Sequence, residues 1–509
     1  MNKRLQKEFE NSCEYLLPDY MGDVKKLLTS NAKAFCNGKF VGEDCVEISG
    51  SVEYDLLYVD AEGKLTPVSV ASDFSESFEI DSEKYIDCAE ESKILGVRVR
   101  VTGPRKILLK ADMQTSLTVR EEDCVGINLD SLSQNTNVEK CSAEVNFANS
   151  VFLKSGEREY AEIVERLEGD DFKDAEIISS SASTVVNSVS VSDGEVSIKG
   201  ENIVSAIVSI GDSAPRLVKK AFPFEEVIVS EDIKSNMMAV ADGCVGSVSV
   251  GIGSDGEGSA LVANIISEYS VELMENTSAT VITDAYTVDC DCKNSYKNSE
   301  LSELVWAGTE KFSIDLRCEK TRENLKDLSQ IISMCAQLRS VNVTETENEC
   351  QFSGEIMLNG VGYETNVDGS QTYIPIKIQE EFREKVNVGC QISDKNKLEC
   401  FLSVNDCEVE CDAQILFVKC HVTAKIYVYN PKTVNVLTAC EVIDSAVEGR
   451  AISKITVYYP KEGDRLFDVA KKYKTTSKKI AEDNLLTESA LSSFDTANSL
   501  MGVKKLIIR

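Results

Sequence analysis

Histidine, the most frequent general base in enzymes, occurs only once in this chain, at His421. A Ser-His-Asp or Cys-His arrangement would depend on this one residue. His421 follows Cys420 in a strand-like run, and Cys400, Cys407 and Cys411 precede it, so a zinc site is one interpretation. The spacing has no Cys-x-x-Cys pair, and a strand points neighbouring side chains to opposite faces. We therefore expect no metal site and interpret His421 as a core or surface residue.

Other catalytic signatures are missing. The sequence has no Gly-x-x-x-x-Gly-Lys-Ser/Thr loop, so we expect no nucleotide hydrolysis. The pair Cys290 and Cys292 alternates as in a strand and is an equally weak metal signal. No carboxylate pair stands out among the 85 Asp and Glu residues. We expect a non-catalytic protein without a cofactor, and keep an enzyme with an unrecognised carboxylate site as an alternative.

The charge of the chain is strongly negative and uneven. The 509 residues carry a formal net charge of −31, which disfavours nucleic acid and anionic membrane surfaces as partners. Residues 455–509 contain 10 Lys and Arg against 7 Asp and Glu, a net of +3, so the preceding 454 residues carry −34. A basic tail on an acidic body indicates that the two parts have different partners.

The sequence also predicts where the protein is found. The first twenty residues have no continuous apolar segment, so we expect no secretory signal. No run approaches the roughly 18 apolar residues of a membrane helix, so we expect no direct membrane insertion. Without export, the 18 cysteines are expected as free thiols, many of them small buried hydrophobes such as Cys350 and Cys420.

An internal repeat appears when residues 23–58 are shifted by 150 and then by 304 positions. Apolar residues and one glycine coincide in all three copies: Leu27 and Leu28 with Ile177 and Ile178 and with Ile331 and Ile332; Ala32 with Ala182 and Ala336; Ile48 with Ile198 and Phe352; Gly50 with Gly200 and Gly354. The apolar pair and the alanine fit one face of a short helix, and the alternation around the glycine fits a strand. A glycine inside a strand indicates a bulge or a close backbone approach.

Each copy of about 150 residues therefore predicts one short helix and several strands, most simply a β-sandwich. Residues 158–167 and 322–338 also have a helical pattern. The period is far longer than that of solenoid repeats, so we expect separate domains joined end to end with limited interfaces.

The first copy begins with Leu-Pro-Asp-Tyr at residues 17–20, followed by Asp23. This stretch resembles the SPOCS domain family, which occurs in spore coat and spore morphogenesis proteins. The other two copies lack the Pro18 and Asp19 pair, so their assignment depends on the repeat. From the residues alone, Pro18 fixes a turn, and Asp19 or Asp23 caps the expected helix.

The C-terminal residues resemble a LysM module, a small βααβ fold. Ile455, Val457 and Tyr459 alternate as a first strand, and residues 463–466 match the Gly-Asp-Thr-Leu turn except that Arg465 replaces the threonine. The resemblance implies binding of N-acetylglucosamine-containing glycans in a shallow groove. A charged arginine at the lip of that groove suits an acidic protein surface better.

We expect the module to bind its partner through the turn, the helices and their cations. These residues are Gly463, Asp464, Arg465, Leu466, Phe467, Lys471, Lys472, Lys474, Lys478, Lys479 and Asn484. The alternative that the lysines only solvate a helix face is equally open.

The combination of SPOCS repeats with a C-terminal LysM module resembles the SipL-like spore engulfment and coat morphogenesis proteins. The expected fold is mainly β, with three tandem β-sandwich-like SPOCS repeats that contain short helices and one βααβ LysM domain. The expected domains are 1–139, 140–297, 298–452 and 453–509.

The resemblance implies a scaffold in the mother-cell cytoplasm at the forespore surface, whose LysM module contacts the coat-basement ATPase, stage IV sporulation protein A. Other coat proteins are further expected partners. The alternative is a protein that binds peptidoglycan or N-acetylglucosamine in the spore cortex or wall.

Overall fold

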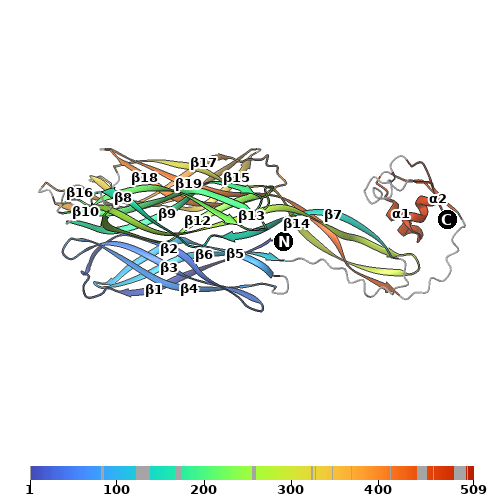
Figure 1. Cartoon of the computed structure of the whole chain (residues 1–509), viewed down its shortest axis with the longest axis horizontal. Helices are drawn as coiled ribbons and strands as arrows, with labels where there is room; N and C mark the ends of the chain where they lie inside the picture. Colours follow the sequence, from blue (N-terminus) through green and yellow to red (C-terminus); the bar gives the residue numbers. More distant parts are fainter. Residues whose placement is uncertain are drawn as a thin grey trace.

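The computed structural model describes residues 2–81, 85–121, 138–167, 174–211, 213–254, 259–321, 325–326, 328–346, 348–367, 370–412, 414–443, 455–461, 463–486, 500 and 503–509. Across these residues the chain is mainly β, with several small antiparallel sheets and two short helices near the C-terminus, as the sequence predicts (Figure 1). Long runs of alternating apolar and polar residues produce this outcome, because each strand buries one face.

Strand pairing stays within three stretches, which we call unit 1 (2–121), unit 2 (138–287) and unit 3 (291–443). The strands of unit 1 are β1 (Asn2–Leu16), β2 (Val24–Val41), β3 (Cys45–Asp60), β4 (Leu65–Glu79), β5 (Tyr85–Gly103) and β6 (Lys106–Glu121). Those of unit 2 are β7 (Val138–Lys154), β8 (Arg158–Arg166), β9 (Ala175–Ser192), β10 (Glu195–Ile210), β11 (Arg216–Val229), β12 (Met238–Ser254) and β13 (Ser259–Thr287). Those of unit 3 are β14 (Asp291–Glu319), β15 (Gln330–Thr346), β16 (Glu349–Thr365), β17 (Gln371–Asn387), β18 (Lys397–Cys411) and β19 (Ile415–Ile443).

The same topology recurs in each unit. Unit 1 has sheets ordered β1-β6-β5 and β2-β3-β4. Unit 2 repeats them as β7-β13-β12 and β9-β10-β11, with β8 added beside β13, and unit 3 as β14-β19-β18 and β15-β16-β17. Side chains from both sheets of a unit share a core, for example Tyr54 and Leu109 in unit 1. The predicted boundaries after residues 139 and 297 fall inside β7 and β14, and the one after residue 452 lies outside the described residues.

The repeated glycines lie where the backbone approaches other groups closely. A Cβ atom at Gly50 would collide with the carbonyl oxygen of Phe35 on the neighbouring strand and with the ring of Phe74 on the other side. Corresponding carbonyl oxygens and phenylalanine rings surround Gly200 and Gly354. The close approach expected from the sequence is therefore confirmed at all three positions, and a larger residue would push these strands apart.

The prediction of short helices inside the repeats is wrong. The three apolar segments that begin the copies form strands β2, β9 and β15, and residues 158–166 form strand β8. The expected helix at 322–338 overlaps β15, and part of it lies outside the described residues. A spacing of four, as between Leu28 and Ala32, fits a helix face but also fits the period of two in a strand. Pairing with the central strand of each sheet decides the outcome.

The turn at Pro18 is an architectural feature that involves no helix. The Arg105 guanidinium donates hydrogen bonds to the carbonyl oxygens of Leu17, at 3.2 Å, and Pro18, and forms an ion pair with Asp23 at 3.1 Å. Arg105 also lies 3.8 Å from Asp19 Oδ1, so Asp19 and Asp23 contribute to a turn held by an arginine rather than to a helix cap.

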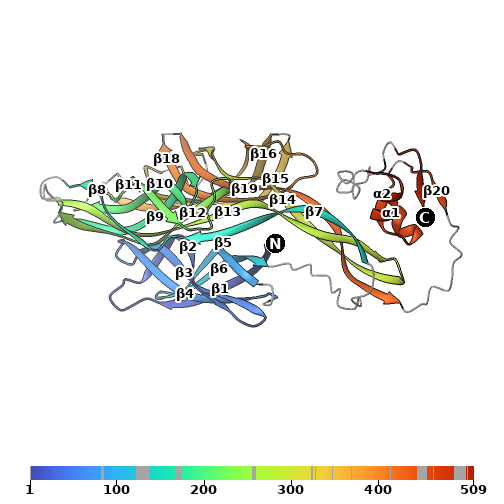
Figure 2. The ribbon, with the colours of Figure 1, turned by 45° about the vertical axis from the view of Figure 1, so that its right-hand side comes forward.

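The expectation of separate domains with limited interfaces is also wrong. Leu28, Ile178 and Ile332, the equivalent positions found in the sequence repeat, meet in one buried cluster. A second equivalent set joins them there: Leu57, Ile207 and Val361. Each unit therefore buries part of its apolar surface only against the other two, and the three units lie side by side (Figure 2).

Hydrogen bonds around this cluster pass from each unit to the next. Positions 33, 183 and 337 are equivalent in the repeat, and each side chain donates to a backbone carbonyl of the following unit. The bonds are Lys33 Nζ to Ala182 O (3.2 Å), Ser183 Oγ to Asn405 O (2.9 Å) and Gln337 Nε2 to Ile94 O (2.9 Å). A cyclic order of this kind indicates approximate threefold symmetry of the three-unit body.

One arm extends from this body. Strands β13, β14 and β19 are each 29 residues long, and with β7 they project beyond the other strands toward the C-terminal helices (Figure 2). Val145 and Val281 from the β7–β13 pair pack against Val434 and Val436 from the β14–β19 pair. The two strand pairs therefore support each other along the arm, whose tip is the connection from β13 to β14.

We predict that Ile332→Ala destabilises the three-unit body by about 2–5 kcal/mol, because it opens a cavity at the contact between all three units. The matched control is Val343→Ala in the same strand, where the side chain is exposed and the expected change is within about 0.5 kcal/mol. Urea unfolding followed by circular dichroism measures both. Equal stability of the two variants would show that the shared cluster does not hold the units together.

Candidate functional site

The C-terminal module contains β20 (Thr456–Tyr458), α1 (Leu466–Tyr473), α2 (Ser477–Asp483) and β21 (Leu506–Ile508), in the order βααβ. Its two strands pair antiparallel. The Thr476 hydroxyl caps α2 by accepting a hydrogen bond from the Lys479 backbone N–H at 3.1 Å. Apolar residues from both helices and from β21, including Leu466, Ile480 and Leu506, form one buried cluster with Cys141 of β7 and Tyr286 of β13.

Several predicted partner-binding residues support the module itself. Asp464 accepts hydrogen bonds from the Lys461 backbone N–H and the Tyr458 hydroxyl, and these bonds lower its pKa. Gly463 precedes it with φ +89°, a conformation that favours glycine. Asn484 connects the end of α2 to β21 through hydrogen bonds to the backbone of Ile507 at 2.7 Å. Leu466 and Phe467 are buried.

The module is docked on the tip of the arm through one aromatic anchor. Tyr286, near the end of β13, is 1% exposed, and its ring meets the ring of Phe467 edge-on with centroids 5.1 Å apart. Its hydroxyl donates to the carbonyl oxygen of Thr475 at 2.7 Å. Burial raises the pKa of this phenol, so it remains a neutral donor at physiological pH. Buried tyrosines with a satisfied hydroxyl are typical centres of binding energy.

Cations of the module surround this anchor and pair with acids of the tip. Lys471 Nζ lies 2.6 Å from Asp284 Oδ2, and Lys474 Nζ lies 2.9 Å from Asp291 Oδ1. Arg465 forms an ion pair with Asp468 in its own helix and also donates to Cys141 Sγ of β7 at 3.6 Å. Three of the predicted partner-binding cations are thus engaged within the chain.

The remaining predicted cations face outward. Lys472 lies over the rings of Tyr458 and Tyr473, and Lys478 and Lys479 are exposed on α2. The sequence-predicted strand residues Ile455, Val457 and Tyr459 are 59%, 48% and 68% exposed, so they form an apolar row on the outer side of the module. The module therefore has one face turned to the arm, and these lysines and apolar side chains are exposed to solvent.

Sequence reasoning missed the acceptor side of this docking contact. Asp284, Tyr286 and Asp291 surround the connection between two long strands, where the sequence reads Asp-Ala-Tyr-Thr-Val-Asp-Cys-Asp. A tyrosine surrounded by acidic residues at a strand end was the available signal for a docking site. The sequence was interpreted there only at Cys290 and Cys292.

The zinc interpretation of His421 does not match the geometry. Cys407 and Cys420 face the core, with their sulfur atoms 3.5 Å apart. His421 lies on the opposite face of β19, where its ligand nitrogen and carboxylate oxygens of Asp406 and Glu408 are within 4.8 Å of one another. Successive strand residues point to opposite faces, so the histidine and the thiols do not converge. In this cluster Asp406 is already paired with Lys219 of unit 2.

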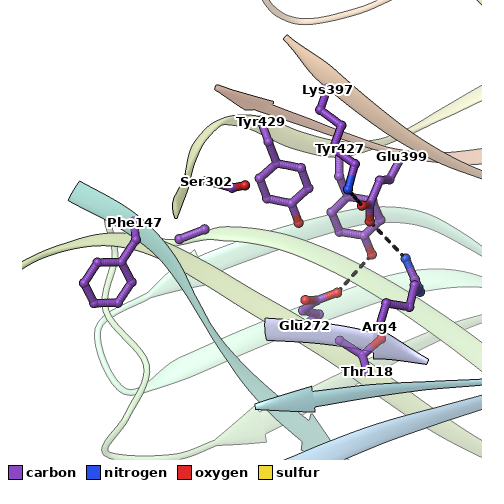
Figure 3. Close-up of a pocket in the computed structure, with 10 residues that line it drawn as sticks. Arg4, Thr118, Phe147, Glu272, Ser302, Lys397, Glu399, Tyr427 and Tyr429 are labelled. Atoms are coloured by element: carbon purple, nitrogen blue, oxygen red, sulfur yellow. Dashed lines mark hydrogen bonds and ion pairs between the residues drawn. The ribbon is translucent and has the colours of Figure 1, made fainter. Parts of the chain in front are cut away.

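A polar pocket of about 220 Å³ occupies the junction of the three units (Figure 3). Arg4 of unit 1 lies 3.9 Å above the ring of Phe401 and 3.3 Å from Glu399 Oε2, both in unit 3. Glu272 of unit 2 accepts a hydrogen bond from the Tyr427 hydroxyl of unit 3 at 3.0 Å. The pocket thus joins the units by polar contacts, and each carboxylate in it has a partner.

Glu272 is the acid of this pocket whose pKa is shifted. Burial raises its pKa, and hydrogen bonds from Ser150 and Tyr427 only partly oppose that change. The Tyr427 phenol has a pKa well above its usual range for the same reason, so it donates to the carboxylate. The residues that line the pocket are Arg4, Thr118, Phe147, Ala148, Glu272, Ser302, Lys397, Glu399, Tyr427 and Tyr429.

Comparisons with known proteins identify no relative. No family model, curated protein or solved structure matches this chain. The assignment to the SPOCS and LysM families therefore stays a prediction from residue patterns. Among the described residues, neither helix has the length and apolar character needed to cross a bilayer.

We predict that Glu272→Gln stabilises the protein at pH 7 and that the gain disappears as the pH falls. With a raised pKa, the folded state binds more protons than the unfolded state above about pH 4.5, so wild-type stability decreases as the pH rises through that window. Glutamine keeps an acceptor for Tyr427 without the buried charge. Thermal unfolding between pH 4.5 and 8 measures the effect.

The control for this prediction is Glu231→Gln, at an exposed position, which should leave the pH profile unchanged. A Glu272→Gln variant less stable than wild type at pH 7 would contradict the prediction, because it would mean that the ionised carboxylate stabilises the junction.

Proposed function

We propose that the chain is a non-catalytic spore morphogenesis adaptor. In this proposal three β-sandwich-like SPOCS repeats form the base, and the C-terminal LysM module docks on the coat-basement ATPase, stage IV sporulation protein A, at the forespore surface. The adaptor acts in the mother-cell cytoplasm and promotes coat localisation and encasement.

The observation that carries the proposal is the position of the module at the end of the arm (Figure 1). Residues 455–509 have a net charge of +3, whereas the preceding 454 residues carry −34. An acidic partner would be repelled by the base at close range but could approach the module from outside. The arm gives the separation that this requires, since repulsion between exposed charges is largely screened beyond about 10 Å at 0.1 M salt.

The chemistry of the module's exposed residues supports protein binding. Lys478 and Lys479 present exposed ammonium groups, and Ile455, Val457 and Tyr459 add an apolar row. Protein interfaces combine an apolar centre with polar groups at the rim. The three-unit body supports an architectural role, because a shared buried cluster joins its three repeats.

We predict that purified stage IV sporulation protein A binds the full-length chain and loses binding to a chain that ends at Lys454. The double variant Lys478→Glu and Lys479→Glu should weaken binding by about tenfold, or about 1.4 kcal/mol. Co-precipitation of tagged protein with graded amounts of the ATPase measures this.

The matched control is Lys395→Glu, an exposed lysine of unit 3, which should bind normally. Equal binding by the full-length and shortened chains would place the contact in the β units and contradict the proposal. If full-length protein retains peptidoglycan fragments and no ATPase, the glycan-binding alternative replaces it.

A further inference from the structure

The docking contact between the module and the arm is built from a small, defined set of groups. On the module these are the ring of Phe467, the carbonyl oxygen of Thr475, the guanidinium of Arg465 and the ammonium groups of Lys471 and Lys474, which we call the docking face. The side chains they meet belong to residues 284–291 at the arm tip and to Cys141 of β7. An aromatic anchor with paired charges at its rim is the usual composition of a specific protein interface.

The module and the arm tip complete one buried cluster. Apolar residues of helices α1 and α2 and of strand β21 share it with Tyr286 and Cys141 of the tip, and the rest of the arm is supported by packing between its own strands. Only the 12 residues between Ile443 and Thr456 connect β19 to the module. Twelve residues span at most about 40 Å. A tip from a second chain carries the same residues and would complete the same cluster.

A second copy of the chain presents the same tip and the same docking face. We propose that the docking face is a receptor for an acidic tip with one tyrosine, and that it exchanges its own tip for the tip of a second copy. Two chains would then hold each other reciprocally, each module on the arm of its partner, as in other exchanges of identical elements. This inference goes beyond the adaptor function and does not depend on it.

The length of the connection sets the conditions for exchange. The contacts are the same within one chain and between two, so the balance depends on concentration. A short connection keeps the module's own tip at an effective concentration in the millimolar range. Dilute wild-type protein should therefore be monomeric, and exchange should occur where copies are crowded, as on a shared surface.

Reversing the charges of one ion pair distinguishes docking within one chain from docking between two chains. Lys471→Glu places a second acid beside Asp284, and Asp284→Lys places a second cation beside Lys471, so each single variant weakens docking within its own chain. When the two variants are mixed, each docking face meets a complementary tip on the other chain. We predict a 1:1 complex in the mixture at tens of micromolar, measured by sedimentation velocity, while each variant alone is monomeric.

Two controls accompany the mixture. The double variant Asp284→Lys with Lys471→Glu restores the pair within one chain and should be monomeric. Lys478→Glu, which alters an exposed lysine of α2 outside the docking face, should form no complex with Asp284→Lys.

The exchange would be overturned by two results together. The mixture would stay monomeric, and the module of the double variant would resist proteolysis as well as that of wild type. Single variants that keep the module as protected as wild type would overturn the docking contact itself. If Asp284→Lys unfolds the arm, the pair Asp291→Lys and Lys474→Glu gives the same test, because Asp291 is exposed.

Discussion

The contact of three equivalent apolar side chains, Leu28, Ile178 and Ile332, is the constraint on which the rest of the structure depends. Each belongs to the first strand of the second sheet in its unit, so the contact fixes the same edge of all three units at one place. Once these edges meet, the cyclic hydrogen bonds from positions 33, 183 and 337 can form. A repeat in the sequence thus becomes a symmetric body because each copy has the same apolar surface to bury.

The symmetry is broken where the arm begins. In unit 1 the strand β6, at the centre of the first sheet, has 16 residues, whereas β13, β14 and β19 have 29 residues each. The extra length of units 2 and 3 carries the β13–β14 connection away from the acidic base and brings Tyr286 to the module. The arm is therefore the element that converts a compact β body into one that presents a basic module at a distance.

Much of the fold could be predicted from local patterns. Alternation predicted the strands, and Gly50, Gly200 and Gly354 predicted the close backbone approaches, because each requirement is met within one sheet. The helices expected at Leu28 and its equivalents failed because a spacing of four satisfies two periods, and only pairing with β3, β10 and β16 decides between them.

The site was harder to predict than the fold. The turn, helix faces and Asn484 of the module could be identified because they are close in sequence. The docking of Lys471 on Asp284 joins residues 187 positions apart, and no local pattern reports such a pair. For the same reason the sequence grouped all the module's cations into one surface, whereas the structure divides them between the arm and solvent.

The docking of the module on the arm tip is the central claim, and zero-length carbodiimide cross-linking of dilute wild-type protein tests it most directly. We predict a Lys471–Asp284 cross-link within monomers, identified by mass spectrometry, together with the Lys219–Asp406 cross-link between units 2 and 3. Recovery of the second cross-link without the first would show that the module is not held at the arm tip, and the account would be wrong.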